Sequence, residues 1–445
     1  MKIKKLGRAF EYKNGIGLSY SASGIEFEAV DGFKCELSSD RWDMLEIPEI
    51  HQPRFVLFCD GVQVIDDRMP ETRMNLLFGN CGKHVYRLIK VSESADSTVF
   101  VSNLRSCGTD SGMESDISLT DSQSSNMPNG AMTDSQSSDM PNGAITDRRF
   151  SNMPNVATTD SQSSDMSESA TAGGPGCGCI KKNATEPAKR LRIEFIGDSI
   201  TCGYGVEGKL SPDDHYTTAT ENCLKAYAWL CAEKLSADCT LVSKSGAGII
   251  SGYTPDGVRN TGNLLAPVYD RAGCSEGKTD DGGSVEDIAW NGGEEPDIVV
   301  VNLGTNDVSY CFPGGGFNAE NISDEEKRAV CYDGEGILTK TQQEKINEIR
   351  CSFFYNEYRK FLKAIRNRYE NAEIICTLGI MNSELNGTVK RAANDSCAEL
   401  GKVHFFEFSL YDAENDGLGT DYHPSAISQE KAAKELAAYI NHASK

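Results

Sequence analysis

The first hundred residues consist of short runs in which apolar and polar positions alternate, and turn-forming residues separate the runs. The runs span 17–21, 24–29, 54–59, 62–65, 83–90 and 97–101. The Asp60-Gly61 step joins two of these apolar runs, which is a strong signal for a two-residue hairpin turn. Short strands at this spacing predict an antiparallel β-sandwich over residues 1–105.

Between residues 106 and 187 the composition changes to Ser, Asp, Met, Asn, Gly and Thr. Four related units begin near Leu119, Met132, Ile145 and Thr158, at a period of thirteen residues. This period is too short for a solenoid repeat, and the units offer too few apolar side chains to build a shared core. We therefore expect a disordered acidic linker, with a partner-binding role for the repeat as the alternative.

From residue 188 to the C-terminus at residue 445, apolar strands alternate with helical segments, which predicts an α/β domain with a parallel sheet covered on both faces. The expected strands span 192–197, 240–243, 297–302, 373–378 and 402–406. The expected helices span 218–235, 342–368, 385–400 and 425–443. Two Gly-rich insertions, 273–293 and 313–336, are long loops of the kind that contacts substrate on such a scaffold.

The first strand of this domain ends in Gly197-Asp198-Ser199. Gly197 can adopt the backbone angles that place Ser199 at the carboxyl end of the strand, where open α/β sheets bind their ligands. We interpret Ser199 as a nucleophile and Asp198 as a turn residue whose carboxylate bonds nearby backbone amides. Gly-Asp-Ser alone is a weak signal because it occurs in many turns, so the assignment depends on the segments that follow.

Three later segments offer the other groups that ester hydrolysis through a serine requires. They are Ser245-Gly246-Ala247-Gly248, Gly304-Thr305-Asn306-Asp307 and Asp421-Tyr422-His423-Pro424. His423 is the expected general base, and either the Asp421 carboxylate or a nearby backbone carbonyl would hold its second ring nitrogen. The expected oxyanion donors are the backbone amides of Ser199 and Gly246 and the side-chain amide of Asn306.

These four segments, in this order, resemble those of the SGNH or GDSL-type hydrolases over roughly residue 191 to the C-terminus. Within that superfamily, Ile-Glu-Phe-Ile-Gly-Asp-Ser-Ile-Thr-Cys-Gly-Tyr-Gly (193–205) and Asn-Leu-Gly-Thr-Asn-Asp (302–307) look like segments of carbohydrate esterase family 2. The resemblance implies a three-layer α/β/α hydrolase domain (188–445) with an N-terminal jelly-roll domain packed against it. It also implies removal of acetyl groups from plant polysaccharides, with a preference for position 6 of a hexopyranose.

One departure from the superfamily concerns the group that orients the base. The superfamily spaces acid and base as Asp-x-x-His, whereas Asp421 and His423 are only two positions apart. In the esterase family this third member varies, and a main-chain carbonyl can replace the carboxylate. We therefore rank Ser199 and His423 above Asp421 as catalytic residues.

Aromatic residues near these segments are candidates for stacking on a sugar ring. Trp290 resembles a tryptophan that family members carry just ahead of the Asn306 segment, and a buried loop anchor is the alternative role. Tyr204, Tyr269 and Tyr310 are weaker candidates of the same kind.

Charge and composition narrow the classes of partner. The formal net charge of −22 argues against nucleic acid or an anionic membrane, because both need a basic face. The six histidines show no metal-ligand spacing, so we expect no metal and no cofactor. No segment is long and apolar enough to cross a bilayer, and the N-terminus lacks the apolar core of a secretory signal. We therefore expect a cytoplasmic protein with mostly reduced cysteines, with export by a route that leaves no recognisable signal as the alternative.

The sequence as a whole predicts a serine esterase that removes O-acetyl groups from xylan- or mannan-type oligosaccharides or polysaccharides through an acetyl-Ser199 intermediate. Two alternatives stay open: a lipase-like hydrolase of other small esters, and a non-catalytic carbohydrate-binding protein on the same fold. A lipase would act on long acyl chains, for which we find no continuous apolar lid. A binding protein would not need the complete set of Ser199, Gly246, Asn306 and His423. The oligomeric state stays open.

Overall fold

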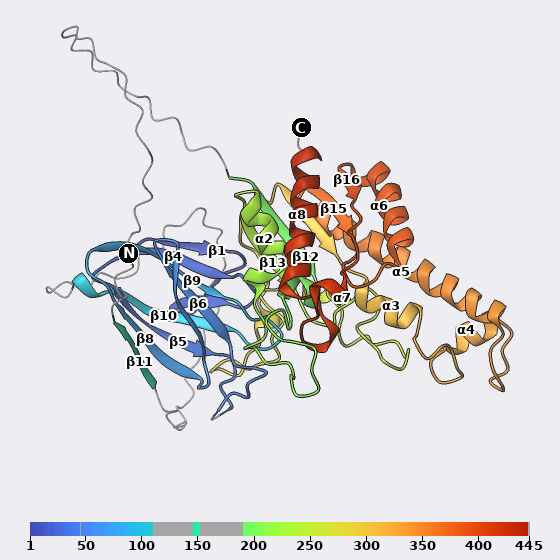
Figure 1. Cartoon of the computed structure of the whole chain (residues 1–445), viewed down its shortest axis with the longest axis horizontal. Helices are drawn as coiled ribbons and strands as arrows, with labels where there is room; N and C mark the ends of the chain where they lie inside the picture. The colour runs from blue at the N-terminus through green and yellow to red at the C-terminus, as the bar shows by residue number, and fades with distance from the viewer. Residues whose placement is uncertain (45, 110–145, 152–189, 444–445) are drawn as a thin grey trace, which may run out of the picture.

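The computed structural model of the chain describes residues 1–44, 46–109, 146–151 and 190–443. A β-sandwich built from the N-terminal residues lies beside an α/β domain built from the C-terminal residues (Figure 1). This arrangement confirms the predicted fold class. Both domains contribute buried residues to one apolar cluster at their junction, which includes Ala22, Val56, Ile193 and Tyr227.

The β-sandwich consists of two sheets, with strand orders β1-β4-β9-β6-β7 and β11-β8-β5-β10-β3-β2. Its strands are β1 (Ile3–Leu6), β2 (Phe10–Tyr12), β3 (Gly15–Leu18), β4 (Gly24–Val30), β5 (Phe33–Ser39), β6 (Arg54–Cys59), β7 (Val62–Arg68), β8 (Arg73–Gly79), β9 (Lys83–Lys90), β10 (Val99–Ser106) and β11 (Thr146–Ser151). The predicted hairpin joins β6 to β7, and Asp60 and Gly61 both have positive φ, as a type I′ turn requires. Strands β5 and β8 lie outside the predicted runs, although their buried residues alternate.

The predicted linker falls mostly outside the described residues. Its described parts are Ser106, which ends β10, the 3₁₀ turn η1 (Cys107–Thr109), and β11, which pairs in parallel with β8. The starts of the four predicted repeat units, at 119, 132, 145 and 158, lie outside the described residues.

The α/β domain has a five-stranded parallel sheet with the order β13-β12-β14-β15-β16. The strands are β12 (Arg192–Gly197), β13 (Asp238–Ser243), β14 (Ile298–Asn302), β15 (Glu373–Thr377) and β16 (Val403–Phe405). The helices are α1 (Ser199–Cys202), α2 (Tyr227–Lys234), α3 (Thr305–Cys311), α4 (Asp324–Ala329), α5 (Lys340–Arg368), α6 (Asn386–Leu400), α7 (Ala413–Asp416) and α8 (Ala426–Ala443). The 3₁₀ turns of this domain are η2 (Cys223–Lys225), η3 (Ala266–Val268), η4 (Val285–Asp287) and η5 (Thr420–Tyr422).

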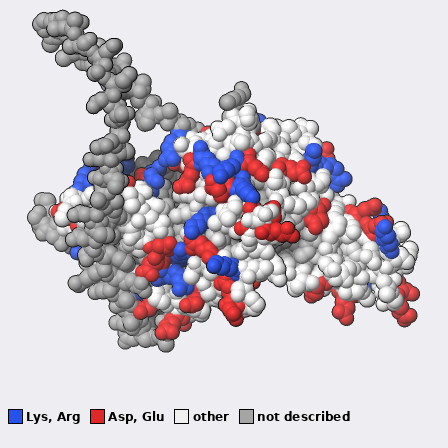
Figure 2. Space-filling model, in the orientation of Figure 1, with Lys and Arg blue, Asp and Glu red and all other residues white. Residues whose placement is uncertain are grey.

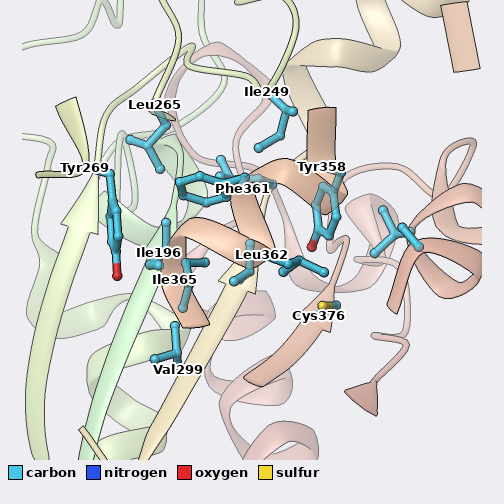
Figure 3. Packing of buried hydrophobic residues seen from close by; sticks show 14 of the residues in the cluster. Ile196, Ile249, Leu265, Tyr269, Val299, Tyr358, Phe361, Leu362, Ile365 and Cys376 are labelled. Atoms are coloured by element: carbon cyan, nitrogen blue, oxygen red, sulfur yellow. The ribbon is translucent and has the colours of Figure 1, made fainter. Parts of the chain in front are cut away.

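Helices cover both faces of this sheet. Successive side chains of a strand point to opposite faces of the sheet. One set packs in an apolar cluster with α5 and α6, and the alternate set packs in a second cluster with α2 and α8. Buried residues of α5 recur at helical spacing, at 346, 350, 354, 358, 361, 362 and 365. Figure 3 shows Tyr358, Phe361, Leu362 and Ile365 of this stripe beside Ile196 of β12 and Val299 of β14.

The predicted helix over 218–235 is wrong in its first half. Thr218 instead donates its hydroxyl to the carbonyl of Glu49 in the sandwich, at 3.1 Å. Asn222 caps the short turn η2 through the amide of Leu224, and helix α2 begins only at Tyr227. Contacts with the other domain therefore override the helical pattern in this segment.

The insertion 273–293 is an interdomain contact. The amide of Cys274 donates to the hydroxyl of Ser94 at 2.9 Å. The backbones of Lys278 and Arg41 pair in an isolated parallel β-bridge. The insertion is thus held against the sandwich. These contacts do not support the substrate contact that the sequence predicts for this insertion.

Charges of both signs are interspersed on the face drawn in Figure 2. No helix among the described residues has the length and apolar character needed to span a membrane. The cysteines in the described ranges are free thiols, and Cys177 and Cys179 lie outside those ranges.

Candidate active site

The carboxyl ends of three neighbouring strands bring the predicted segments together. Ser199 follows β12, Gly246 follows β13 and Asn306 follows β14. Strand β12 lies between β13 and β14 in the sheet. The connections therefore run to one side of β12 to reach β13 and to its other side to reach β14, β15 and β16. Such a topological switch point is where open α/β sheets bind ligands.

The turn that carries Ser199 depends on a glycine. A Cβ atom at Gly197 would lie 2.0 Å from Oγ1 of Thr201, so a larger residue could not occupy this position without moving the turn. Asp198 caps α1, because its Oδ1 accepts the amide of Ile200 at 3.1 Å. This contact fits the turn role predicted for Asp198. Burial raises the pKa of Asp198 to about 7.

Ser199 and His423 form a hydrogen-bonded dyad. The Ser199 Oγ lies 2.8 Å from Nε2 of His423. On the other side of the ring, Nδ1 lies 3.2 Å from the backbone carbonyl oxygens of both Thr420 and Asp421. An Nδ1–H that donates to these carbonyls leaves the Nε2 lone pair free to accept the serine proton. Burial lowers the pKa of His423, which favours this neutral, basic form of the ring.

The carboxylate of Asp421 does not orient the base. Its Oδ2 accepts the hydroxyl of Tyr204 at 2.8 Å, while the backbone carbonyl of the same residue faces His423. Asp421 and Tyr422 both have positive φ, and this left-handed turn points the carbonyls of η5 at the ring. Of the two groups that the sequence leaves open, the structure places the backbone carbonyl at Nδ1.

Two backbone amides, of Ser199 after β12 and of Gly246 after the neighbouring strand β13, are candidate oxyanion donors. Within the described residues, neither the amide of Ser199 nor that of Gly246 donates to a protein group. Gly246 has a φ of 69°, in the left-handed region that favours glycine. The two amides are therefore available as donors, and their oxyanion role stays a prediction.

The third predicted donor, Asn306, is already engaged. Its Nδ2 donates to the carbonyl of Ala247 at 2.9 Å and to Oδ2 of Asp198 at 3.3 Å. Serving an oxyanion would require release of the longer bond. The neighbouring Asp307 accepts the amides of Ile249, Ile250 and Ser251, and so ties the loop after β13 to helix α3.

Comparison with known proteins identifies the family of the chain. The GDSL-like Lipase/Acylhydrolase family matches residues 195–431, more than half of the chain. The chain belongs to this family. Its first and last segments at the site, around Ser199 and His423, both lie inside the matched range.

Two curated relatives share sequence with the chain. It is 30% identical over 268 residues to "Cellulase/esterase CelE" of Acetivibrio thermocellus, an alignment that covers 58% of this chain and 26% of the relative. It is 26% identical over 261 residues to "Acetylxylan esterase / glucomannan deacetylase" of Cellvibrio japonicus, covering 57% and 60%. The chain thus spans about a quarter and three fifths of the lengths of these relatives.

Solved structures share the fold over the whole chain. A family two carbohydrate esterase from Clostridium thermocellum in complex with cellohexaose has a TM-score of 0.60 at 21% identity, with 99% of both chains covered. The acetyl xylan esterase Est2A from Butyrivibrio proteoclasticus has a TM-score of 0.65 at 20% identity, with coverage of 99% and 96%. The sandwich and the GDSL-family domain therefore share the fold of these esterases.

Tyr204 lies at the dyad and packs against the base. Its ring centroid is 4.4 Å from that of His423, and the ring also stacks on Tyr216 with 4.0 Å between the centroids. This half-buried ring supports the imidazole and holds the Asp421 carboxylate, so the structure gives it a supporting contact in addition to the predicted substrate contact.

Trp290 lies at the amino ends of the parallel strands, whereas Ser199 follows the carboxyl end of β12. This tryptophan is 6% exposed and belongs to an apolar cluster with Phe10 and Phe100 of the sandwich. The cavity beside it is lined by Arg192 and Asp238, which begin β12 and β13. The amino and carboxyl ends of a six-residue strand are separated by roughly 17 Å. The stacking role predicted for Trp290 is therefore wrong, and the buried anchor is its observed role.

The weaker aromatic candidates are also packing residues. Tyr269 is buried and donates to Glu194 at 2.9 Å, and Tyr310 is buried beneath the guanidinium of Arg350.

Two exposed tyrosines at the site escaped the sequence interpretation. Tyr422 precedes His423 and is 63% exposed. Tyr253 is 58% exposed, and its amide donates to the carbonyl of Gly246 at 2.9 Å. Their closeness in sequence to the predicted segments was the available signal. Their exposure depends on the folded loops and could not be predicted from that signal.

Side chains of metal-ligand type gather at two places in the described residues. Cys59, Asp60 and His84 lie together at the hairpin turns of the sandwich. Glu93, Cys202 and Glu221 lie together and buried beneath the active site. Residue spacing alone shows neither group, because each draws on separate strands or on both domains.

The geometry at Nδ1 predicts a small effect of Asp421→Asn. Asparagine keeps the left-handed turn and the backbone carbonyl, so we expect kcat/KM to fall less than about tenfold, compared with the ~10⁴-fold loss in enzymes that need the carboxylate.

The same residue affects the pH dependence. In the unmodified protein, the pH at which kcat/KM falls on the acid side should lie below 6.5, because burial lowers the pKa of His423. The nearby Asp421 charge raises that pKa, so its removal should move this fall further to acid. A pH–rate profile with p-nitrophenyl acetate measures both effects. A loss near 10⁴-fold would contradict the assignment.

Proposed function

We propose that this chain is a serine esterase that removes O-acetyl groups from acetylated xylan- or mannan-type oligosaccharides or polysaccharides. The observation that carries the proposal is the 2.8 Å contact between Ser199 Oγ and His423 Nε2, beside two unengaged backbone amides. The relative from Cellvibrio japonicus, an acetylxylan esterase and glucomannan deacetylase, supports this substrate class.

The dyad supports a two-step reaction. Ser199 Oγ attacks the acetyl carbonyl carbon while its proton moves to Nε2 of His423. The amides of Ser199 and Gly246 stabilise the oxyanion of the tetrahedral intermediate, with Asn306 as the proposed third donor. The bond between the acetyl carbon and the sugar oxygen then breaks, and His423 gives its proton to that oxygen, leaving acetyl-Ser199 and the free sugar hydroxyl. Water, deprotonated by the same nitrogen, attacks the acetyl carbon. The bond to Ser199 Oγ breaks, acetate leaves and His423 returns the proton to Oγ.

Exposed aromatic rings beside the dyad support a sugar substrate. Tyr253 and Tyr422 extend from the loops that carry Gly246 and His423, and aromatic faces pack well against the apolar face of a pyranose. We assign substrate contact to these two residues, with Tyr204 behind them against the imidazole. A preference for the acetyl group at position 6 of a hexopyranose belongs to the same proposal.

The test is release of acetate from acetylated xylo- and manno-oligosaccharides, with p-nitrophenyl acetate, butyrate and octanoate alongside. We expect acetate from the sugars and rates on the chromogenic esters that fall as the acyl chain lengthens. Tyr253→Ala should raise KM for the oligosaccharides more than for p-nitrophenyl acetate. The matched control is Tyr12→Ala, which removes a half-buried tyrosine of β2 that packs in the cluster of Trp290, at the other end of the sheet. Preference for octanoate would overturn the acetyl-sugar assignment in favour of a lipase. Sugar binding without turnover of any ester would identify a binding protein.

A cytoplasmic location remains part of the proposal. Cell fractionation of the producing organism with an antibody to the chain would test it, and recovery from the medium would favour export.

A further inference from the structure

A glutamate from the sandwich reaches the catalytic loops. Glu93 follows β9, is 2% exposed, and lies in the segment that connects β9 to β10. Its Oε2 accepts the backbone amide of Ser245 at 2.7 Å, and the thiol of Cys202 lies 3.6 Å from the same oxygen. Ser245 directly precedes Gly246, and Cys202 is three residues after Ser199. One carboxylate therefore contacts both the oxyanion loop and the helix of the nucleophile.

The direction of the Gly246 amide depends on the peptide units around Ser245. The Ser245 carbonyl belongs to the same rigid peptide plane as the Gly246 N–H, and Asn263 donates to that carbonyl at 2.9 Å. Glu93 accepts the N–H of the preceding plane. Since Gly246 is in the left-handed region and glycine is permissive, these neighbours restrict which way its N–H points.

Glu93 is itself held from several sides. Its backbone amide donates to Glu221 Oε2 at 2.9 Å, and its carbonyl accepts the Nζ of Lys90 at 2.7 Å. Lys90 and Glu221 are both fully buried. Tyr216, which stacks on Tyr204, donates to the same oxygen of Glu221 at 2.8 Å. These contacts hold the backbone of Glu93, from which its side chain reaches the Ser245 amide.

We propose that Glu93 is a positioning residue for ester hydrolysis, which orients the Gly246 N–H toward the oxyanion, and that the sandwich is thereby a working part of the active site. The inference rests on the proposed function only in requiring a tetrahedral intermediate on Ser199. A charge-assisted bond from a buried carboxylate is among the stronger contacts available to a backbone amide. Preorganised donors of this kind act mainly in the transition state.

The test compares Glu93→Ala, Glu93→Asp and Glu93→Gln with the unmodified full-length chain. Loss of an oxyanion donor itself costs about 10²–10³ in kcat, so loss of its support should cost less, and we expect a fall of about tenfold to thirtyfold in Glu93→Ala with KM nearly unchanged. Glu93→Asp is too short to reach the Ser245 amide and should behave similarly, which keeps the test open if the alanine variant does not fold. Glu93→Gln keeps an oxygen acceptor and should stay within about fivefold.

Two readouts separate positioning from general damage. A boronic acid that forms a tetrahedral adduct on Ser199 should bind Glu93→Ala more weakly by the factor that kcat loses. The matched control is Tyr20→Phe, which deletes another buried interdomain hydrogen bond, from Tyr20 Oη to the carbonyl of Val268 at 2.8 Å. It should leave kcat and boronate affinity within about twofold.

The outcomes are distinct. An unchanged kcat in Glu93→Ala, a loss fully accounted for by a smaller folded fraction, or an equal loss in Tyr20→Phe would overturn the positioning role. All rates are measured with p-nitrophenyl acetate, so a failure on acetylated sugars would reject the proposed substrate and leave the Glu93 result intact. If no ester is turned over, the boronate affinities still decide whether Glu93 supports the oxyanion loop.

Discussion

Replacing Ser199 by alanine should lower kcat by about 10⁴–10⁶ while leaving KM or sugar affinity within a few fold. The side chain is 6% exposed and its oxygen lies 2.8 Å from the base, so the substitution removes the nucleophile and little else. The remaining rate would come from the oxyanion donors acting on a bound water. Stopped-flow release of p-nitrophenolate measures the loss, and the burst that reports the acyl-enzyme should vanish with it.

The Ser199–His423 dyad also predicts how the losses in kcat combine when both residues are replaced. Ser199 and His423 act as one unit, so the double variant Ser199→Ala/His423→Ala should be no slower than either single variant by more than about tenfold. Ser425→Ala is the matched control, because it removes a hydroxyl two residues from His423 whose partners are the carbonyl of Asp416 and the amide of Ser428. It should retain activity within about twofold. Additive losses, or a Ser199→Ala variant with normal turnover, would mean that another group is the nucleophile.

The sequence predicts the position of the site better than its atomic contacts. Ser199, Gly246 and Asn306 each follow a strand, and strands of a parallel sheet end at one edge, so their convergence follows from the alternating pattern. Which atom of Asp421 faces the base depends instead on two left-handed residues in η5. A single sequence carries no signal for this choice, because both the carbonyl and the carboxylate belong to the same residue.

The errors share one physical cause, which is contact between distant segments. The place of Trp290 before the Asn306 segment suggests that it stacks on a sugar ring. In the structure, Phe10 and Phe100 of the sandwich bury it at the amino end of the parallel strands. Glu93 lies 152 positions before Ser245, and nothing in its own segment distinguishes it from an exposed acidic residue. Local pattern identifies strands and turns, whereas these roles arise only when the two domains pack together.

The same packing buries an ion pair whose loss should be costly. Arg8 follows β1 in the sandwich and Glu194 lies in the middle of β12, and their side chains are 0% and 3% exposed. The guanidinium donates to Oε2 of Glu194 at 3.2 Å and to the carbonyl of Tyr269. It also lies 5.0 Å from the ring centroid of Tyr269 and 5.6 Å from that of Trp290. Most of its surface is therefore in contact with the α/β domain.

Arg8→Met should lower the free energy of unfolding by about 3–5 kcal/mol, because it leaves the Glu194 carboxylate buried with no cation. The hydroxyls of Tyr269 and Tyr369 still donate to that carboxylate, at 2.9 and 3.1 Å, but they do not supply a charge. Urea unfolding followed by tryptophan fluorescence and circular dichroism measures the change. Lys13→Ala is the matched control at the same domain boundary, since it breaks exposed ion pairs with Asp280 and Asp281 and should cost about 1 kcal/mol or less.

Adding Glu194→Gln to Arg8→Met should recover part of the lost stability. Tyr269 and Tyr369 donate to different oxygens of Glu194, so glutamine keeps an acceptor for one hydroxyl and offers its amide N–H to the oxygen of the other. Because the substitution also removes the unpaired charge, the double variant should be more stable than Arg8→Met alone by about 1–3 kcal/mol. If the double variant is less stable than Arg8→Met, the cost arises from lost packing of the guanidinium and not from a stranded charge. If Arg8→Met costs under about 1 kcal/mol, the two domains do not depend on this pair. The expected coupling would show that the sandwich and the β12 strand, which carries Ser199 at its end, are stabilised as one unit.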